Sequence, residues 1–469
     1  MLKLNTLKKS SAIGAACLCA CAASTAWGQD LTVKSPPQDL PVIIRHATAH
    51  PISGPAIPDS VIWLSKGKIE GVFTAADFAN IERTASWQSP GPVEIDATGK
   101  HVYPGMIAPY TQLGLDEIGM VEATRDYHET GAITPEVRAI TAVNPDSTLL
   151  PVTRANGVLV AGVFPKNGLI PGQPAVIQLE GWTWEDMAVE PSIGMAVEWP
   201  NMRPVSSWWM RTSEAEQKKQ VRKAVDAIEG AFSTALSYFE ARRENPRTPN
   251  DLRWDAMRGV ISVPPAKGMM GLTRQWPVFI VANDYDQITA AVTWAASAKL
   301  RVVIVGGMDA PLCADLLKQN NVSVIVLGTQ RFPKRDDSAY NESFALPAKL
   351  KDAGIPFCIA SGEETPHERN TPYAAGMATA HGLSQDDAIR AVTLSAAEIL
   401  GVSGRLGSLE KGKDATLIVT TGSPIEVSTQ ITDAFIVGKR LDLSNKQTKL
   451  YEKYRERYRQ MNELKNAPK

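Results

Sequence analysis

The chain has 469 residues, of which 44% are hydrophobic and 21% are charged, which is an ordinary globular composition. This length allows one large domain or two to three smaller ones. A formal net charge of -1 provides no global basic field, so nucleic acid is not expected as a partner.

Residues 1–28 have the pattern of an export signal. Three lysines precede a short apolar stretch at 10–23, and a small-x-small site follows at 26–28. The apolar stretch is too short to span a bilayer, and no later run reaches the roughly 18 residues that a membrane helix needs. We therefore expect export across the inner membrane to the periplasm, with no transmembrane segment in the mature chain. The alternatives are a retained membrane helix and a lipid anchor on Cys21.

Only two cysteines, Cys313 and Cys358, lie beyond the predicted signal. Both have apolar neighbours in the sequence, which predicts two buried small hydrophobic side chains. A single disulfide between them is the alternative in an oxidising compartment.

Short strands are predicted near both ends of the chain. Residues 61–72 indicate a hairpin with Gly67 at its turn, and 416–419 and 434–437 indicate further strands. A hairpin alone is not stable, so distant halves of a sheet commonly complete one another. We predict a small composite β-sandwich domain built from residues 29–104 and 405–445.

Between these segments, the pattern of residues 105–404 alternates between strand and helix. Fully apolar strands separated by helices predict a parallel sheet that is covered on its outer face. The clearest apolar runs lie at 277–282, 301–305, 322–327 and 355–360, and earlier ones at 158–164 and 175–179. No nucleotide-binding glycine motif is present. The sequence therefore favours an α/β fold with a (β/α)₈ TIM-like barrel over a doubly wound sheet.

Two segments depart from this pattern. Residues 181–270 predict an insertion over one face of the barrel. Within this insertion, the pattern of residues 213–243 predicts a long helix. Ser213 and Glu216 form the capping box that would open this helix. Residues 446–469 predict a charged C-terminal helix that either docks on the body or a partner, or is solvated.

Several segments carry a family resemblance. Residues 95–107, 391–401 and 406–415 resemble the approach to the first barrel strand, the helix after the eighth strand and the return to the β-domain in the amidohydrolase superfamily, in particular its imidazolonepropionase-like branch. The resemblance covers both ends of the chain and, more weakly, the barrel. It implies metal-dependent hydrolysis of carbon-nitrogen bonds, with zinc or another divalent metal held by His-x-His on strand 1, histidines on strands 5 and 6, and an aspartate on strand 8.

Other residues stand at these positions. Strand 1 ends in residues 109–111, a Pro-Tyr-Thr sequence, and strand 5 ends at Asn283. Strand 6 ends near Gly306, and strand 8 ends at Ser361. None of these supplies the imidazole or carboxylate that the family's metal needs. We therefore predict no metal site and no cofactor.

The favoured interpretation is a pseudoenzyme that serves as a non-catalytic binding or scaffold subunit. A small-molecule ligand would lie in the pocket at the barrel mouth where the family holds its metal. The chain would form a homo-oligomer or pair with an active relative. The candidate lining residues are Tyr110, Gln112, Asn283 and Ser361.

The alternative is an active hydrolase of non-peptide carbon-nitrogen bonds in cyclic amides, or of small peptides, through a rearranged site. The candidates lie in the loop after strand 8, where active-site loops of barrels gather. They are Glu363, Glu364 and His367. A solvated polar loop is the other explanation for this segment, because charged side chains are mostly exposed.

Overall fold

The computed structural model describes residues 33–84, 90–205, 212–261, 275–362 and 364–461. The chain from Lys34 onward forms one compact unit. The predicted export signal, including Cys21, lies outside the described residues. None of the helices in the described part combines the length and the apolar character that a membrane span requires.

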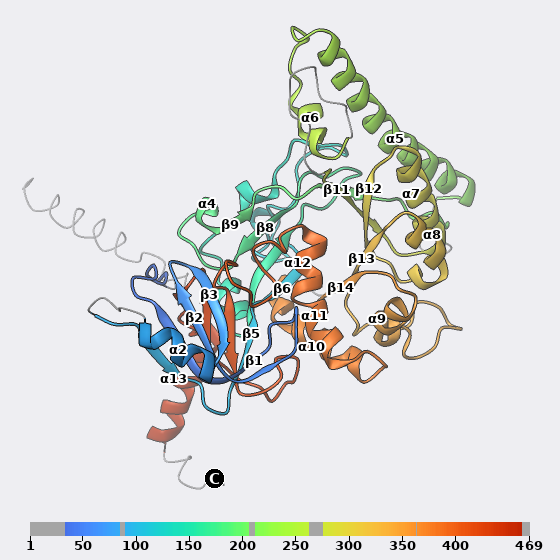
Figure 1. The fold of residues 1–469 in the computed structure, drawn as a ribbon. Helices are drawn as coiled ribbons and strands as arrows, with labels where there is room; N and C mark the ends of the chain where they lie inside the picture. Colours follow the sequence, from blue (N-terminus) through green and yellow to red (C-terminus); the bar gives the residue numbers. More distant parts are fainter. Residues whose placement is uncertain (1–32, 85–89, 206–211, 262–274, 363, 462–469) are drawn as a thin grey trace, which may run out of the picture. The chain divides into compact units, whose positions relative to one another are not determined.

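One eight-stranded sheet joins the two ends of the chain, in the order β17-β16-β15-β5-β1-β2-β3 with β4 beside β1. The strands are β1 (Val42–Ala49), β2 (Ile57–Ser65), β3 (Lys68–Thr74), β4 (Val93–Asp96), β5 (His101–Pro104), β15 (Leu417–Thr420), β16 (Ile431–Ile436) and β17 (Lys439–Arg440). Figure 1 shows the early blue strands beside the late orange-red ones, and the link is the antiparallel pair of β5 and β15. The predicted composite β-domain is confirmed.

The hairpin between β2 and β3 has the predicted glycine at its turn. Lys66 and Gly67 have φ angles of 50° and 77°, which are the left-handed values of a tight hairpin turn. A Cβ atom on Gly67 would lie 2.7 Å from Cγ1 of Val437. The turn therefore packs directly against the C-terminal part of the sheet.

The core of this sheet contains side chains from both ends of the chain. Ile44 and Ile62 from the N-terminal part and Leu417 and Phe435 from the C-terminal part have no exposed surface. Because they form one cluster, neither half has a complete core of its own.

Replacing Phe435 by alanine tests this shared core. Removing a fully buried phenylalanine costs about 3–5 kcal/mol of unfolding free energy. Urea unfolding followed by circular dichroism should show that loss for Phe435→Ala. The control Val427→Ala changes a side chain that is 73% exposed and should shift stability little. Equal effects of the two substitutions would contradict the shared core.

Two histidines and a tyrosine form a stack where β1 ends beside β5. Nε2 of His50 lies 3.0 Å from Nδ1 of His101, and the rings of His50 and Tyr103 are stacked with centroids 4.2 Å apart. Burial, followed by the nearby charge of His101, lowers the pKa of His50 to about 4. His50 is therefore neutral in the folded protein at neutral pH.

This shift predicts a pH dependence of stability. The folded pKa of His50 lies below the ordinary value of 6.5, so the unfolded chain binds the additional proton. Stability is thus fully present above pH 6.5 and falls as the pH drops toward 4, by at most about 1.4 kcal/mol per pH unit. Denaturation midpoints of wild type and His50→Gln, measured from pH 7 to 5, should converge as the pH falls. Parallel curves would contradict this assignment.

The barrel strands form two sheets. The strands of the parallel sheet are β10 (Met195–Glu198), β11 (Pro277–Ala282), β12 (Arg301–Gly306), β13 (Ser323–Leu327) and β14 (Phe357–Ala360). Those of the other sheet are β6 (Met106–Thr111), β7 (Val158–Val163), β8 (Ala175–Gln178) and β9 (Ala188–Glu190). β6 contacts β14, so the first strand of this region lies beside the last, as a barrel requires.

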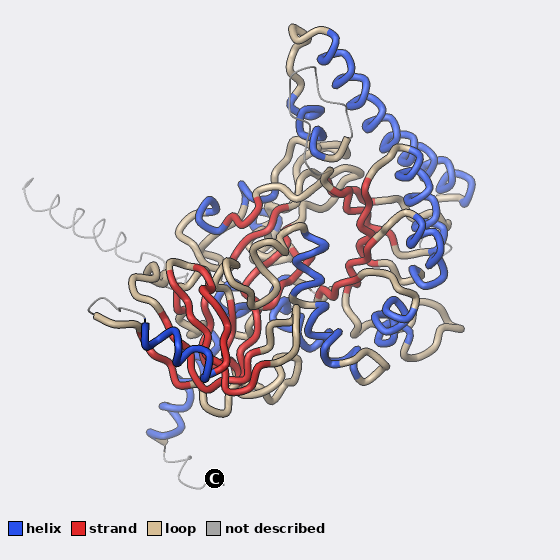
Figure 2. Tube along the Cα trace, viewed as in Figure 1, coloured by secondary structure: helices blue, strands red, loops and turns tan. Residues whose placement is uncertain are grey.

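Helices alternate with these strands, and Figures 1 and 2 show α7 and α8 on one side of the parallel sheet. The α-helices are α2 (Ala75–Thr84), α3 (Leu149–Arg154), α4 (Trp184–Met187), α5 (Glu214–Glu244), α6 (Leu252–Asp255), α7 (Tyr285–Ser297), α8 (Ala314–Gln319), α9 (Glu342–Asp352), α10 (Thr371–Thr379), α11 (Gln385–Ala391), α12 (Leu394–Leu400) and α13 (Lys446–Gln460). The 3-10 helices are η1 (Glu122–Thr124), η2 (Ala139–Ala142), η3 (Ala256–Gly259), η4 (Ala310–Cys313) and η5 (Thr365–Asn370).

The structure differs from the sequence prediction at two strands. β8 belongs to the sheet of β7 but runs antiparallel to it, because the short connection at 164–174 leaves no room for a crossover helix. β10 lies within the predicted 181–270 insertion, yet it pairs in parallel with β11. β10 is therefore part of the barrel wall.

Two local predictions are confirmed. The long helix α5 begins after Ser213, whose side chain accepts a hydrogen bond from the backbone N–H of Glu216. Cys313 and Cys358 are both buried and free, so the alternative of a disulfide between them is wrong.

Candidate functional site

The end of β6 carries the Pro109-Tyr110-Thr111 sequence. The register of β6 against β7 shifts between Ala108 and Thr111, because Pro109 has no N–H to donate to the ladder. The ring of Tyr110 is buried against Phe164 with centroids 4.6 Å apart, and burial raises the pKa of Tyr110. Oγ1 of Thr111 accepts a hydrogen bond from the backbone N–H of Leu113. The Tyr110 side chain thus packs in the core, and the Thr111 side chain stabilises a turn.

Asn283 and Gly306 lie side by side at the ends of β11 and β12. The ideal Cβ position on Gly306 overlaps Oδ1 of Asn283, and Gly306 has a φ of +103°. Oδ1 of Asn283 is buried and has no hydrogen-bond partner among the described residues. In this arrangement, the Asn283 amide therefore fills the position next to which the resemblance expects the strand-6 histidine, and the left-handed φ of Gly306 disfavours any other residue there.

Ser361, which is 5% exposed, directly follows strand β14. Its carbonyl oxygen lies 2.5 Å from the ideal Cβ position of Gly328, and Gly362 has a left-handed φ of +67°. The two strand ends therefore approach so closely that only glycine fits at these neighbouring positions. Ser361 offers a hydroxyl where the resemblance expects a carboxylate.

Acidic groups after β11 and β12 pair with basic groups in the segment after β13. Asp309 is buried, and its carboxylate accepts hydrogen bonds from both terminal nitrogens of Arg335, at 3.1 and 2.5 Å. Lys334 pairs with Asp284, and burial lowers the pKa of Lys334 to about 8. These ion pairs connect the loops around the barrel end.

A cavity of about 630 Å³ opens among the loops that follow β6, β7 and β14. We call it the mouth cavity. The polar residues in its lining include Gln112, Asp116, Glu117, Arg125, Lys166 and Glu364. Of the predicted pocket residues, Gln112 belongs to this lining, and its Nε2 donates to the carbonyl of Phe164 at 3.4 Å. Tyr110 contributes its ring to the cation–π contact of Lys166, while Asn283 and Ser361 are not among the residues that line the cavity.

Of the acid–base candidates predicted in the segment after β14, one lines the mouth cavity. Glu363 lies outside the described residues. Glu364 lines the mouth cavity, and its carbonyl accepts a hydrogen bond from the backbone N–H of His367 at 2.8 Å. The His367 side chain is exposed and is not part of the cavity lining.

Asp116 and Lys166 were not predicted as site residues. Lys166 Nζ lies 5.5 Å from the centre of the Tyr110 ring, and burial lowers the pKa of Lys166. Burial raises the pKa of Asp116, and its Oδ1 has no hydrogen-bond partner among the described residues. A charged residue shortly after an apolar strand was the signal that could have identified Lys166.

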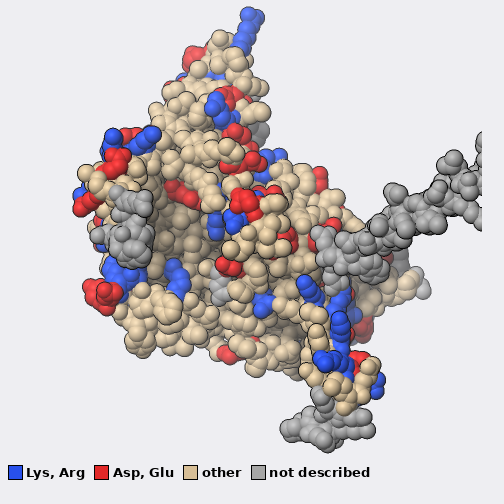
Figure 3. Space-filling view, turned by 180° about the vertical axis from the view of Figure 1, so that it is seen from behind, with Lys and Arg blue, Asp and Glu red and all other residues tan. Residues whose placement is uncertain are grey.

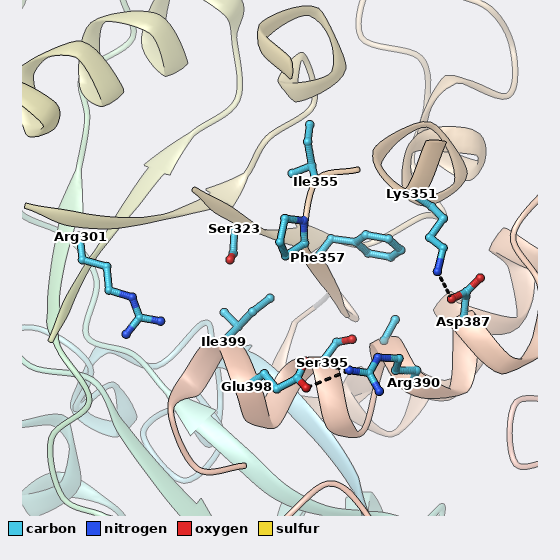
Figure 4. Close-up of a pocket in the computed structure, with 12 residues that line it drawn as sticks. Arg301, Ser323, Lys351, Ile355, Phe357, Asp387, Arg390, Ser395, Glu398 and Ile399 are labelled. Carbon is cyan, nitrogen blue, oxygen red and sulfur yellow. Dashed lines mark hydrogen bonds and ion pairs between the residues drawn. The ribbon is translucent and has the colours of Figure 1, made fainter. Parts of the chain in front are cut away.

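A second cavity, of about 370 Å³, lies at the opposite ends of the strands (Figure 4). It is lined by residues at the starts of β12, β13 and β14 and by α11 and α12. Arg390 pairs with Glu398 at 2.8 Å, and Lys351 pairs with Asp387 at 2.5 Å. The N-terminal ends of barrel strands generally serve stability, so this cavity is a weaker functional candidate.

Charged side chains of both signs share the surface of the molecule. Figure 3 shows acidic and basic side chains interspersed over one hollowed face of the molecule. Within the described ranges, no three His, Cys, Asp or Glu side chains come together in a way that could hold a metal ion.

Part of the chain is similar to known proteins. A model of the amidohydrolase family matches residues 297–442. Imidazolonepropionase from Thermoplasma acidophilum is 31% identical over 108 residues, which are 22% of this chain and 25% of that protein. Imidazolonepropionase from Syntrophobacter fumaroxidans is 33% identical over 82 residues, or 17% and 19% of the two chains. The matches thus span about a quarter or less of the curated relatives.

Solved structures support the same assignment for the fold. An amidohydrolase from Thermotoga maritima superposes with a TM-score of 0.71 at 22% identity, covering 86% of this chain and 99% of that one. A prolidase complexed with N-methylphosphonate-L-proline gives a TM-score of 0.51 at 15% identity, covering 86% and 99%. The predicted TIM-like barrel architecture is confirmed. The chain therefore has the fold of these amidohydrolases, and its residues 297–442 match the amidohydrolase family model.

The contact between Asn283 and Gly306 can be tested by a double-mutant cycle. Gly306→Ala should lower the unfolding free energy by about 1–3 kcal/mol, because its Cβ overlaps the Asn283 amide and its φ is strained. In an Asn283→Ala background, the same change should cost less, since only the backbone strain remains. Urea unfolding provides the four values.

Gly230→Ala is the matched control for this cycle. Gly230 lies inside α5, and nothing lies within 4 Å of its ideal Cβ position. This substitution should stabilise the protein by up to about 1 kcal/mol. Independent effects of the Gly306 and Asn283 substitutions would show that the two residues do not compete for space.

Proposed function

We propose that this amidohydrolase-fold protein binds a small molecule at the barrel mouth as a non-catalytic subunit, without the family's metal-assisted hydrolysis. The observation that carries the proposal is the packing of Asn283 against Gly306. The Asn283 amide fills the space beside Gly306, and the left-handed backbone of Gly306 disfavours a histidine on strand 6.

The donor chemistry at the other strand ends supports the proposal. Pro109 offers no side-chain donor, and the Thr111 hydroxyl already accepts a backbone hydrogen bond. Ser361 replaces a carboxylate by a hydroxyl. Zinc in proteins takes nitrogen, sulfur and carboxylate ligands, so this set does not fit a divalent metal in the family's position.

The cellular setting belongs to the same proposal. The pattern of residues 1–28 supports export to the periplasm, with a lipid on Cys21 as the alternative. A binding subunit of this kind would work as a homo-oligomer or beside an active relative.

The second candidate is a hydrolase of cyclic amides or small peptides. The similarity of short segments to imidazolonepropionases favours it, and Glu364 and His367 lie in the loop after β14. This reading requires a rearranged site in which one of them acts as acid or base.

Elemental analysis separates the two readings. The purified protein, incubated with zinc or manganese and then desalted, should retain far less than one equivalent of metal per chain. Hydrolysis of a panel of cyclic amides and dipeptides should not exceed the rate of the buffer. Metal retained at one equivalent, with hydrolysis that a chelator or His367→Ala abolishes, would establish the hydrolase instead.

A further inference from the structure

Asp116 and Lys166 carry opposite charges into the mouth cavity from two different loops. Asp116 lies in the loop after β6, and Lys166 in the loop after β7. None of the ion pairs among the described residues joins them or involves either of them. The cavity therefore holds an acid and a base that form no direct ion pair among the described residues, although Arg125 acts on Asp116 and Glu198 acts on Lys166 from a greater distance.

The backbone holds both residues in place. The N–H of Lys166 donates to the carbonyl of Tyr127 at 2.8 Å, and Lys166 Nζ lies over the Tyr110 ring. The segment of Asp116 pairs with that of Arg125 through an isolated antiparallel bridge. A ligand would therefore meet two charges that are already positioned, which lowers the ordering cost of binding.

The other charged groups of the lining are already engaged or exposed. Arg125 Nη1 donates to Glu122 at 2.9 Å, and Arg125 Nε donates to the carbonyl of Gly119 at 2.8 Å. Glu117 accepts from Asn144 at 3.5 Å, and Glu364 is exposed. Lys166 and Asp116 are thus two partly buried charges of the lining that form no direct ion pair among the described residues.

We propose that the mouth cavity binds a small zwitterion, a free amino acid or short peptide, with its carboxylate on Lys166 and its ammonium group on Asp116. This inference rests on the proposed binding function and names its ligand class. A simple anion would leave Oδ1 of Asp116 without a hydrogen bond, and a simple cation would leave the Lys166 ammonium group without a direct ion-pair partner. A zwitterion neutralises both, and the volume of about 630 Å³ lies within the usual range of ligand sites.

The directions of the pKa shifts agree with this geometry. Burial lowers the pKa of Lys166 and raises that of Asp116, because the partial loss of water disfavours the charged form of each group in the free protein. A zwitterion supplies a direct ion-pair partner on each side. Binding should therefore move both pKa values back toward their ordinary range.

The test uses the full-length protein and a panel of the proteinogenic amino acids and alanine-containing dipeptides, screened by native mass spectrometry and quantified by calorimetry. At least one member should bind, and its N-acetyl and C-amide derivatives should each bind at least about tenfold more weakly. Lys166→Met and Asp116→Asn should each weaken binding by about ten- to hundredfold. Lys166→Arg should retain most of the affinity.

Lys218→Met is the matched control, because Lys218 is an exposed residue of α5 that pairs with Glu214 within the helix. It should leave affinity unchanged. Failure of every panel member to bind, or binding that neither Lys166→Met nor Asp116→Asn weakens, would overturn the inference. Metal content is measured in the same samples. Metal-free protein that binds no zwitterion contradicts only the ligand class, whereas zwitterion binding by a metal-loaded hydrolase contradicts the proposed function.

Discussion

The antiparallel pairing of β5 with β15 supports the rest of the structure. It joins strands from the two ends of the chain, with Tyr103 opposite Ile418 and Val102 opposite Val419. The N–H of Gly105 continues this link by donating to the carbonyl of Thr416, immediately before β6 begins. The first barrel strand is therefore attached to the composite sheet, and the loop after β6 that carries Asp116 extends from this anchored strand.

The barrel then brings the ends of distant strands together, and the residues there determine the chemistry. Gly306 leaves space that the Asn283 amide fills, and Pro109 shifts the register of β6. The same architecture positions Lys166 over the Tyr110 ring beside the mouth cavity. A shared fold does not imply shared chemistry, so the proposal of binding without metal-assisted hydrolysis rests on the residues at the strand ends and not on the barrel.

Much of the fold could be predicted from the sequence, because apolar runs and caps are local signals. The strand at 277–282 and the cap at Ser213 are examples. The direction of β8 was not predictable, since an apolar run does not encode strand polarity. The contact of Asn283 with Gly306 and the burial of Oδ1 of Asp116 depend on segments that meet only in the folded chain. Such contacts leave no periodic pattern in the sequence.

Anomalous diffraction at the zinc edge, from crystals of the protein grown with zinc, tests the central claim most directly. The account predicts no anomalous peak among the C-terminal ends of β6, β11, β12 and β14, with the Asn283 amide packed beside Gly306. A fully occupied peak among these strand ends, coordinated by side chains of this chain, would contradict it.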